Sequence, residues 1–401
     1  MDNEHQALLN GVRVLDLSRV LAGPYCTMLL GDLGADIIKI EAPGQGDDTR
    51  HWGPPFAAGG ESAYFLCINR NKRSMTLNLK SEQGLEILRE LIRQSDILVE
   101  NFRVDTLERW GLSYAALQEL HPGLIYCTIT GYGYTGPYRQ LPGYDFIIQA
   151  QGGLMSITGP EDGEPYKVGV AIADITAGLF ACNAILAALF EHQRSGKGQR
   201  IDISLLDSQI AWLANVGSNF LVSGETPRRY GNAHANIVPY QTFKASDGYF
   251  ALAVGNDSQW RQFCEKIGRG EWAEDVRFCT NASRVNNREV LIPLLNGLFA
   301  QSAISHWLTL LESIGVPCGP INTIDQVLAN PQVQARQMVI DVTHPSAGTV
   351  KLVASPLKIP TAPPVVRFPP PMLGEHSHQI LHDLLGYSNQ RIEDFRLAQV
   401  I

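Results

Sequence analysis

Short apolar segments recur along the first half of the chain, with helical segments between them. Residues 12–17, 35–40, 96–100 and 124–130 are rich in valine, isoleucine and leucine and have the length of single strands. Apolar runs of this kind are typical of strands buried on both faces of a parallel sheet. Strands that alternate with helices build such a sheet between two helical layers. The sequence therefore predicts an α/β fold with a parallel sheet within residues 1–205.

Several residues mark where helices begin. Gly23 and Pro24 follow the first expected strand, and proline is favoured in a first helical turn because its missing amide would lack an intrahelical partner there. Ser81, Ser113 and Asp174 precede segments of helical character, and their side-chain oxygens can accept a hydrogen bond from a first-turn amide. We expect helices to start at these positions.

The texture of the sequence changes after about residue 223. A chain of 401 residues exceeds the roughly 250 to 300 residues at which one hydrophobic core stops growing, so two units are expected. Residues 225–330 are predicted to form a small α+β unit, with linkers over residues 206–224 and 331–334. Residues 360–374 hold six prolines, which neither continue a helix nor pair in a central strand. We expect an extended arm there.

Charge and cysteine content exclude some classes of protein. The net charge of −8 argues against nucleic acid as a partner, because a phosphate backbone calls for a broad basic surface. Seven scattered cysteines without a CxxC pair are typical of reduced thiols in a cytosol-like compartment and give no support for structural zinc. The acidic start, residues 1–11, lacks the basic and apolar regions of a secretion signal. We predict a cytoplasmic protein.

One apolar stretch, residues 170–190, approaches the length of a membrane span. It contains Asp174 and Asn183, and an ionised aspartate inside hydrocarbon costs a few kcal/mol. A buried core helix explains the same composition without that cost. We expect no membrane association.

The string GYGYTG at residues 131–136 follows an expected strand and matches the GxGxxG dinucleotide fingerprint. That fingerprint requires a helix to start within the glycines, so that its first amides meet the pyrophosphate. Pro137 and a loop-like stretch follow instead. We therefore expect these glycines to shape a loop, and a nicotinamide dehydrogenase is disfavoured.

Two clusters have both a functional and a structural interpretation. His378 and His382 are four residues apart, a spacing that places two imidazoles on one helix face, with His376 nearby. No further ligand has matching spacing, so a solvated helix face is favoured and no metal is expected. The basic run at residues 70–73 is either a phosphate clamp or a solvated surface.

Asp174 is a lone acid among apolar and small residues. As an N-cap it would accept hydrogen bonds from helix amides, which would lower its pKa. As a nucleophile it would need to be ionised, partly desolvated and approachable, and the small residues Ala173, Ala177 and Gly178 would leave room for a substrate. Both roles are open from the residues alone.

Seven segments in order resemble one enzyme family. They are GVRVLDLSRVLAGPYCTMLLGDLGADIIKIEAPGQGDDTR, NRNKRSMTLNLKS, ENFRVDTLERWG, PGYDFIIQAQGGL, VGVAIADITAG, GVPCGPI and LGEHS, spread over residues 11–377. Together the chain resembles the class III CoA-transferase family, which includes formyl-CoA transferase and carnitine CoA-transferase. The resemblance implies a large Rossmann-like domain formed by residues 1–205 and 335–401, and a homodimer whose subunits are interlocked like links of a chain.

The resemblance also implies the site. Asp174 matches the family's catalytic aspartate, which forms an acyl anhydride and then an aspartyl-CoA thioester. Coenzyme A is then a substrate, and no tightly bound cofactor is implied. The positions that match the family's CoA-binding residues are Leu21, Ala22, Leu77, Asn78, Leu79, Lys80, Asn101, Phe102, Arg103, Arg109, Tyr144 and Asp145.

Two departures from the family bear on specificity. Ala42 stands where formyl-CoA transferase has an arginine near the nucleotide, and its glycine-rich covering loop is replaced here by RRYGNAHANIVPY. Arg228, Arg229 and His234 in that segment are candidates to meet a second carboxylate. We therefore expect a dicarboxylic acid as acceptor, with succinyl-CoA as a possible donor.

Two alternatives stay open. An α-methylacyl-CoA racemase shares the fold and the aspartate, but it needs a second acid–base residue. Racemases of this family carry a histidine where this chain has Tyr144, and an unperturbed tyrosine titrates near pH 10, which favours the transferase. A CoA-binding protein without activity is the second alternative, and the retained Asp174 argues against it.

Overall fold

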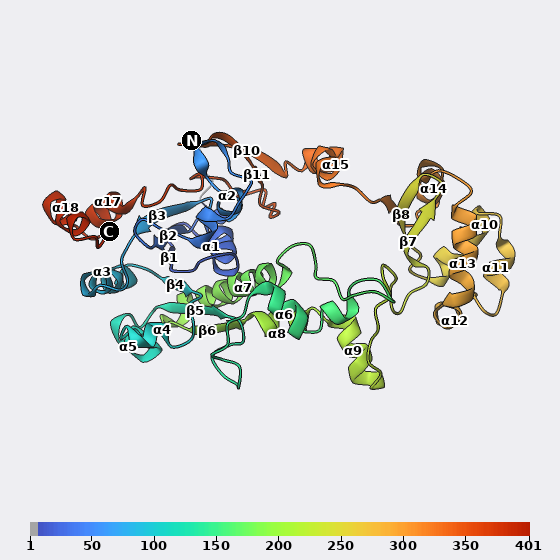
Figure 1. The fold of residues 1–401 in the computed structure, drawn as a ribbon, viewed down its shortest axis with the longest axis horizontal. Coiled ribbons are helices and arrows are strands. Elements are labelled where there is room, and N and C mark those ends of the chain that lie inside the picture. The colour runs from blue at the N-terminus through green and yellow to red at the C-terminus, as the bar shows by residue number, and fades with distance from the viewer. Residues whose placement is uncertain (1–6) are drawn as a thin grey trace. The chain divides into compact units, whose positions relative to one another are not determined.

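The chain divides into two compact units in a computed structural model that describes residues 7–401 (Figure 1). Unit 1 comprises residues 7–152, 169–212 and 331–401, and unit 2 comprises residues 153–168 and 213–330. Residues 1–6, which belong to the acidic start that argues against a secretion signal, lie outside the described part.

Unit 1 is built on a six-stranded sheet in which all strands are parallel. The strand order is β3-β2-β1-β4-β5-β6, the order of doubly wound Rossmann folds. The strands are β1 (Arg13–Asp16), β2 (Asp36–Glu41), β3 (Lys72–Thr76), β4 (Ile97–Glu100), β5 (Ile125–Thr130) and β6 (Arg200–Ser204). The α/β class with a parallel sheet is therefore confirmed.

Four of these strands, β1, β2, β4 and β5, coincide with predicted segments, and two were not predicted. Strands β3 and β6 are the two edges of the sheet. Their sequences, KRSMT and RIDIS, carry charges at adjacent or alternate positions, so neither has the continuous apolar run of a central strand. Apolar periodicity therefore gave no signal for either strand.

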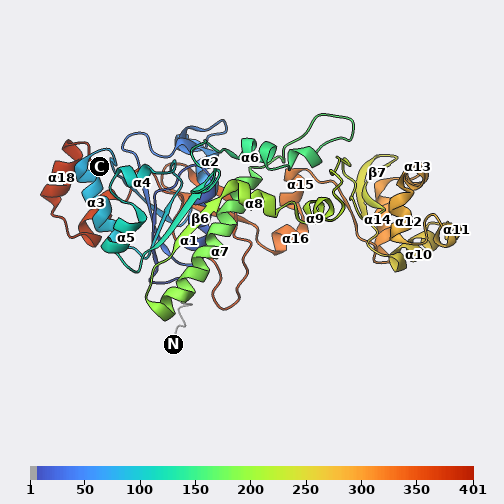
Figure 2. The same cartoon turned by 90° about the horizontal axis from the view of Figure 1, so that it is seen from below.

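Two helical layers cover the sheet, because neighbouring strand residues point to opposite faces. Val14 and Ile37 pack with α1 (Ala22–Asp32) and α7 (Ile172–Ser195), whereas Leu15 and Ile38 pack with α3 (Glu82–Arg93) and the C-terminal α18 (Asn389–Leu397). Figure 2 shows α1 and α7 on one side of the sheet and α3 and α18 on the other.

The other helices of unit 1 lie in loops between the strands and in the C-terminal segment. They are η1 (Asp48–His51), η2 (Ala58–Gly60), α2 (Ala63–Ile68), α4 (Thr106–Arg109), α5 (Tyr114–Leu120), α6 (Asp145–Gln151), α8 (Leu205–Ala211), α16 (Pro331–Ala335), α17 (Ser377–Gln379) and the π-helical turn η4 (Ile380–Leu384). A hairpin of β10 (Val339–His344) and β11 (Gly348–Val353) precedes the proline-rich segment.

Three of the predicted helix starts are confirmed. Pro24 lies in the first turn of α1. The hydroxyls of Ser81 and Ser113 accept hydrogen bonds from the amides of Gly84 at 3.0 Å and Ala116 at 3.3 Å, so they cap α3 and α5. Each capping bond satisfies one of the amides that a helix start leaves without a partner.

The basic run at residues 70–73 is neither a phosphate clamp nor a solvated surface. Arg70 forms an ion pair with Asp32 at 2.6 Å, and Lys72 forms one with Asp16 at 3.2 Å. Both pairs are buried. These cations have carboxylate partners contributed by β1 and α1, which makes a buried charge tolerable.

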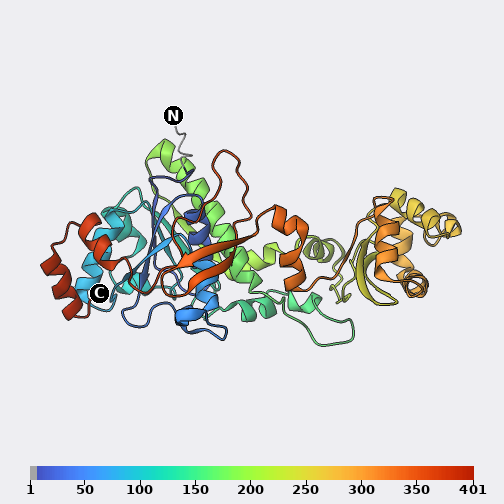
Figure 3. The same cartoon turned by 90° about the horizontal axis from the view of Figure 1, so that it is seen from above.

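The proline-rich segment, residues 360–374, contains no helix or strand and follows the edge of unit 1, as predicted (Figure 3). The amide of Asn71 donates to the carbonyl of Phe368 at 2.9 Å, and Arg50 Nη2 donates to the carbonyl of Pro371 at 3.1 Å. Single hydrogen bonds of this kind replace the strand pairing that proline prevents.

The three C-terminal histidines hold no metal site within residues 7–401. The rings of His378 and His382 stack with centroids 5.8 Å apart, so the two do share a helix face. His378 Nε2 contacts Asn389 Oδ1 at 2.9 Å, His382 pairs with Asp383, and His376 Nδ1 accepts from the amide of Ser74 at 3.3 Å.

Helix α7 is long and apolar enough to cross a membrane by length and composition, and within the described residues it is the single helix of that kind. Half of its most apolar window is buried. The buried residues Ala177, Ala181 and Ile185 contribute to the core that α7 shares with α1 and the sheet.

Unit 2 has an antiparallel three-stranded sheet of order β7-β8-β9 and its own core. Trp260, Phe263 and Phe299 are fully buried there. Its elements are η3 (Met155–Ile157), α9 (Ala214–Ser223), β7 (Tyr240–Ala245), β8 (Gly248–Ala253), α10 (Asp257–Lys266), α11 (Gly270–Glu274), α12 (Asn281–Asn286), α13 (Arg288–Phe299), α14 (Ile304–Glu312), β9 (Cys318–Pro320) and α15 (Ile324–Ala329).

The unit boundaries differ from the predicted ones in three places, one of which is residues 331–334, predicted as a linker but part of helix α16 in unit 1. Residues 153–168, predicted to belong to the large domain, lie in unit 2 because Arg229 Nη2 donates to the carbonyl of Gly163 at 2.7 Å. Residues 206–224, predicted as a linker, are mostly helical, with α8 in unit 1 and α9 in unit 2.

Candidate active site

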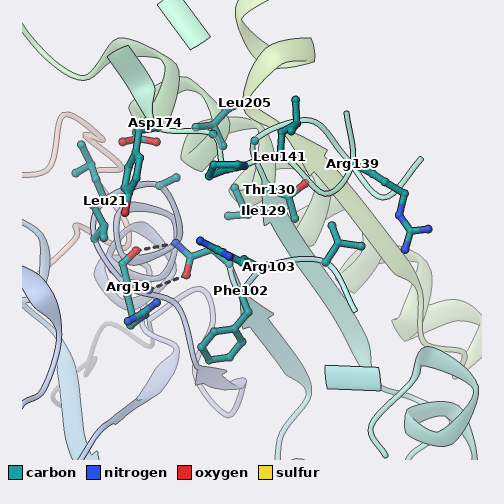
Figure 4. Close-up of a pocket in the computed structure, with 18 of the residues that line it drawn as sticks. Arg19, Leu21, Phe102, Arg103, Ile129, Thr130, Arg139, Leu141, Asp174 and Leu205 are labelled. Carbon is teal, nitrogen blue, oxygen red and sulfur yellow. Dashed lines mark hydrogen bonds between the residues drawn. The ribbon is translucent and has the colours of Figure 1, made fainter. Parts of the chain in front are cut away.

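A cavity of about 200 Å³ opens in unit 1 where β1, β4 and β5 end. In doubly wound folds the strand order reverses between β1 and β4, and the crevice beyond the carboxyl ends of the strands at that point is the usual ligand site. The wall includes the β1 loop with Leu21 and Ala22, the β4 loop with Asn101, Phe102 and Arg103, and also Tyr144 and Asp174. Figure 4 shows Asp174 close to Leu21 and Leu205.

Asp174 lies in the first turn of α7 and is not its N-cap. The cap position is Ala171, and the helix begins at Ile172. No hydrogen bond joins the Asp174 carboxylate to any residue of the described part. Of the two roles left open by the sequence, the structure does not bear out the N-cap, and the carboxylate is free to meet a ligand in the cavity.

The environment of Asp174 raises its pKa instead of lowering it. Burial disfavours the charged form, and the neighbouring carboxylate of Asp145 adds repulsion, so that the pKa of Asp174 rises to about 7. The N-cap interpretation, in which helix amides would lower this pKa, is not borne out because Asp174 lies inside the helix and not at its cap. A carboxylate with little solvation and no hydrogen-bond donor keeps its lone pairs available for attack on a carbonyl carbon.

The side chain that does accept an amide from the first turn of α7 is Asp145. Its Oδ1 accepts from the amide of Ala173 at 2.8 Å, and its Oδ2 accepts from Gln149 Nε2 at 2.7 Å. Asp145 lines neither cavity of unit 1, whereas its neighbour Tyr144 lines the first and is 66% exposed. Of this predicted pair, only Tyr144 is therefore placed to touch a ligand.

The small residues on either side of Asp174 allow a neighbouring helix to approach closely. Ala173, Ala177 and Gly178 are buried. A Cβ on Gly178 would lie 2.6 Å from the carbonyl oxygen of Ala22, so glycine permits the close approach of α7 to α1. The contact fixes α7 against the loop that carries Leu21.

Hydrogen bonds between the β1 and β4 loops shape the cavity wall. The amide of Arg19 donates to Asn101 Oδ1 at 2.9 Å, and Asn101 Nδ2 donates to the carbonyl of Arg19 at 2.7 Å. The amide of Phe102 donates to the buried Glu100 carboxylate at 2.6 Å. Val20 between them has φ of 70°, a left-handed conformation that costs a β-branched residue about 1–3 kcal/mol.

A larger cavity of about 810 Å³ adjoins the first and shares Arg19, Asp48 and Phe102 with it. It is lined by the four residues after β3 that the sequence predicted to bind CoA: Leu77, Asn78, Leu79 and Lys80. Arg109 is not part of its wall and donates to Thr106 Oγ1 at 2.9 Å. Predicted CoA residues therefore divide between two adjoining cavities, with Arg109 and Asp145 outside both.

The C-terminal tail also lines the larger cavity, through Arg396, Gln399 and Ile401. It is held there because the amide of Asn78 donates to the carbonyl of Val400 at 2.8 Å. Sequence reasoning did not find these residues, and no local pattern marks a contact between positions more than 300 residues apart.

The three predicted carboxylate-binding residues lie in unit 2. Arg228 and His234 line a cavity of about 770 Å³ in that unit. Arg228 pairs with Glu161 at 2.7 Å on the surface, whereas Arg229 donates to the carbonyls of Pro160 and Gly163 and so closes a loop. Arg229 is therefore a structural residue, and Arg228 and His234 are the ones exposed to a ligand of this cavity.

Comparison with known proteins assigns the chain to a family. The model of CoA-transferase family III matches residues 9–377. The chain is 45% identical to succinyl-CoA:glutarate CoA-transferase of Mus musculus, over 98% of this chain and 90% of that protein. It is 46% identical to succinate–glutarate CoA-transferase of Agrobacterium fabrum, over 94% and 95%.

A crystal structure of a CAIB/BAIF family protein from Brucella suis has the same fold. It aligns with a TM-score of 0.82 at 47% identity, covering 94% of this chain and 99% of that one. Sequence and structure thus agree over nearly the whole length, and the chain belongs to CoA-transferase family III, as an enzyme of class EC 2.8.3.

Proposed function

We propose that this enzyme transfers CoA from succinyl-CoA to a second dicarboxylic acid of glutarate type, with Asp174 as the covalent nucleophile. The observation that carries the proposal is the Asp174 carboxylate on the wall of the cavity in unit 1, half-buried and without a donor among residues 7–401. The names of the relatives from mouse and Agrobacterium support the substrate pair.

The reaction proceeds by four exchanges at carbonyl carbons. An Asp174 oxygen attacks the succinyl thioester carbon, and the C–S bond breaks to release CoA thiolate and leave an aspartyl-succinyl anhydride. The thiolate attacks the aspartyl carbonyl, which forms an aspartyl-CoA thioester and frees succinate. The acceptor carboxylate then attacks that thioester, and returning thiolate takes the acyl group from the new anhydride.

The two cavities of unit 1 are where we place these steps. Both intermediates are hydrolysable, so water must be kept out, and a thiolate held beside the anhydride reacts with the advantage of an intramolecular step. We place the reacting thioester in the smaller cavity beside Asp174 and the nucleotide in the larger one, near Lys80. Lys80 is exposed there, and its ammonium group suits a phosphate.

For the second carboxylate of the diacid we propose Arg228 and His234. An exposed ion pair such as Arg228–Glu161 contributes little stability, so a substrate carboxylate can replace Glu161 as the partner of the arginine. Arg229→Ala is a poor control because it removes loop contacts. Lys351→Ala, which removes a different exposed ion pair, is a better one.

We also propose the interlocked homodimer and a cytoplasmic location. Leu179, Phe180 and Phe190 are apolar side chains of α7 that stay exposed in a single chain, and apolar surface of this kind is typical of subunit interfaces. All seven cysteines of the chain lie within the described part and are free, which suits a reducing compartment. Light scattering of the purified protein measures the subunit number.

A racemase is less well supported than a transferase. Proton exchange at a substrate carbon needs an acid–base residue besides Asp174. Among the described residues that line the smaller cavity there is no histidine, and Tyr144 stands at the position in question. Incubation of a chiral 2-methylacyl-CoA with the enzyme in D₂O separates the two activities.

The function is tested by a transfer assay. Succinyl-CoA is offered with a panel of mono- and dicarboxylic acids, and the new thioester is identified by mass spectrometry. We expect glutaryl-CoA and related diacid thioesters to form faster than acetyl-CoA or butyryl-CoA. Equal rates for monoacids and diacids would overturn the proposed specificity, and no transfer to any acid would overturn the proposed function.

A further inference from the structure

The N-terminal turn of helix α6 lies next to the first turn of α7, and the Asp145 carboxylate joins the two helices. Asp145 is the first residue of α6. Its two oxygens are both engaged, Oδ1 with the amide of Ala173 at 2.8 Å and Oδ2 with Gln149 Nε2 at 2.7 Å. Ala173 immediately precedes Asp174, so this contact acts on the backbone that carries the proposed nucleophile.

We propose that Asp145 is a positioning residue, whose carboxylate holds the first turn of α7 and so fixes Asp174 on the cavity wall. The inference rests on the proposed function, because it assigns to Asp145 a role that serves Asp174. It differs from a role in CoA binding, since the Asp145 side chain does not line either cavity of unit 1.

Hydrogen bonds and packing hold the Asp145 side chain in a fixed position. Gln149 is fully buried and belongs to the same helix, so its hydrogen bond to Asp145 spans one helical turn. Helix α6 is in turn tied to α8, because Gln209 Nε2 donates to the carbonyl of Ile148 at 2.9 Å. Residues whose own positions are locked by packing and hydrogen bonds are what hold a reacting group in place.

The same geometry gives Asp145 an electrostatic effect. The charge of its carboxylate opposes the Asp174 anion. Other titratable or charged side chains around the cavity are Arg19, Asp48, Arg103, Arg139 and Tyr144 on its wall, Tyr64 from α2 and Tyr25 from α1. Asp145 differs from these other side chains because its charge contributes to the raised pKa of Asp174.

Two variants separate the two effects of Asp145. Asp145→Asn keeps an oxygen that can accept from the Ala173 amide but removes the charge. We expect the acidic limb of the kcat against pH profile to move to lower pH by about 1 unit, with the affinity for CoA unchanged within about twofold. Asp145→Ala also removes the acceptor, and we expect kcat to fall at least about tenfold because the nucleophile is no longer held.

A matched control is Asp96→Asn. Asp96 also accepts a backbone amide, that of Arg13 at 2.8 Å, but it lies at the opposite end of the strands from the cavity. We expect its pH profile to keep the wild-type midpoint. Circular dichroism and urea unfolding of each variant show whether the fold is retained.

The outcomes distinguish this inference from the proposed function. A kcat at least about tenfold lower in Asp145→Ala, with unchanged CoA affinity and with kcat largely retained in Asp145→Asn, supports the positioning role, and a shifted acidic limb in Asp145→Asn supports the electrostatic effect. An undiminished kcat in Asp145→Ala, or a weaker affinity for CoA at unchanged kcat, overturns the positioning role while Asp174→Ala remains inactive. Full activity of Asp174→Ala would overturn the proposed function itself, and the positioning role with it.

Discussion

Two regions of unit 1 bury carboxylates next to the same sheet, and they treat them in opposite ways. In β1, the side chain of Asp16 has no exposed surface and is surrounded by Lys72 of β3 at 3.2 Å and by the hydroxyls of Thr27 and Ser18. Burial alone would raise the pKa of Asp16, but Lys72, Lys39 and the two hydroxyls keep it below the usual value. At the start of α7, Asp174 has burial and a like charge but no donor, and its pKa rises to about 7.

The comparison shows what distinguishes a buried carboxylate that can react from one that stabilises the fold. When a buried carboxylate is fully paired, its lone pairs accept hydrogen bonds that stabilise the fold and are not available for reaction. An unpaired one on a cavity wall costs stability, and the cost is tolerated because the group can react. This chain has one carboxylate of each kind next to the sheet, and four variants test whether the distinction holds.

The largest expected effect is on catalysis at Asp174. Replacement by alanine removes the nucleophile, and we expect kcat for transfer from succinyl-CoA to fall by at least about 10³-fold. Affinity for CoA, measured by calorimetry, should change little because we place the nucleotide in the other cavity. Loss of CoA binding together with activity would instead mean that Asp174 supports the site rather than the chemistry.

The next effect is on stability at Asp16. Asp16→Asn leaves Lys72 buried without a counter-charge, and breaking a buried pair in this way typically costs about 3–5 kcal/mol. Urea unfolding at pH 7 measures the free energy of unfolding of the variant against wild type. A loss below about 1 kcal/mol would show that the pair is not a structural element. The double variant Asp16→Asn with Lys72→Met should recover part of the loss.

A smaller effect of opposite sign is expected for Asp174→Asn. The pKa of Asp174 in the folded chain, about 7, exceeds the value of about 3.9 in an unfolded chain, so the wild type loses stability as pH rises from about 4 to 7. The variant has no such loss. We expect its free energy of unfolding to exceed that of wild type by about 1–2 kcal/mol at pH 8, after allowance for partial exposure, and by much less at pH 4.

Thermal melts at the two pH values, with each sample at the same protein concentration, measure that difference. Equal melting temperatures for wild type and Asp174→Asn at pH 8 would contradict the raised pKa. A gain of the same size at both pH values would indicate a packing effect of the amide instead of an effect of charge.

The smallest effect is expected at Asp36, which is paired but partly exposed. Its carboxylate meets Arg13 at 2.9 Å and Arg73 at 2.7 Å, and its side chain is 31% exposed. Asp36→Asn should therefore lower the free energy of unfolding by about 1 kcal/mol or less, and the loss should shrink in 0.5 M salt because exposed pairs are screened. A loss as large as that of Asp16→Asn would remove the distinction drawn from burial.

Sequence patterns found the central strands and missed the edges for a physical reason. Strands β4 and β5 are buried on both faces, so their apolar runs are continuous. Strand β3 carries Lys72, which is buried by pairing with Asp16, a partner 56 positions away. No local pattern reveals that a lysine has a distant counter-charge, so the sequence alone offers a clamp or a solvated surface for residues 70–73.

The site was predictable where a motif carries it and not where geometry does. Resemblance to the family identified Asp174, and serine caps were readable because a cap and its amide are three residues apart. The sequence could not show that Asp145 accepts an amide from the first turn of α7, because the Ala173 amide and its acceptor are 28 positions apart. The same applies to the C-terminal residues on the wall of the larger cavity.

The covalent role of Asp174 is tested most directly by trapping the enzyme during turnover. The protein is mixed with succinyl-CoA, treated with borohydride, digested and analysed by mass spectrometry, with Asp174→Ala alongside. Borohydride reduces an aspartyl thioester to the alcohol, so we predict homoserine at position 174 in the wild type that depends on succinyl-CoA and is lacking in the variant. An unmodified peptide from enzyme that is turning over, or a variant that transfers CoA at the wild-type rate, would contradict the covalent mechanism.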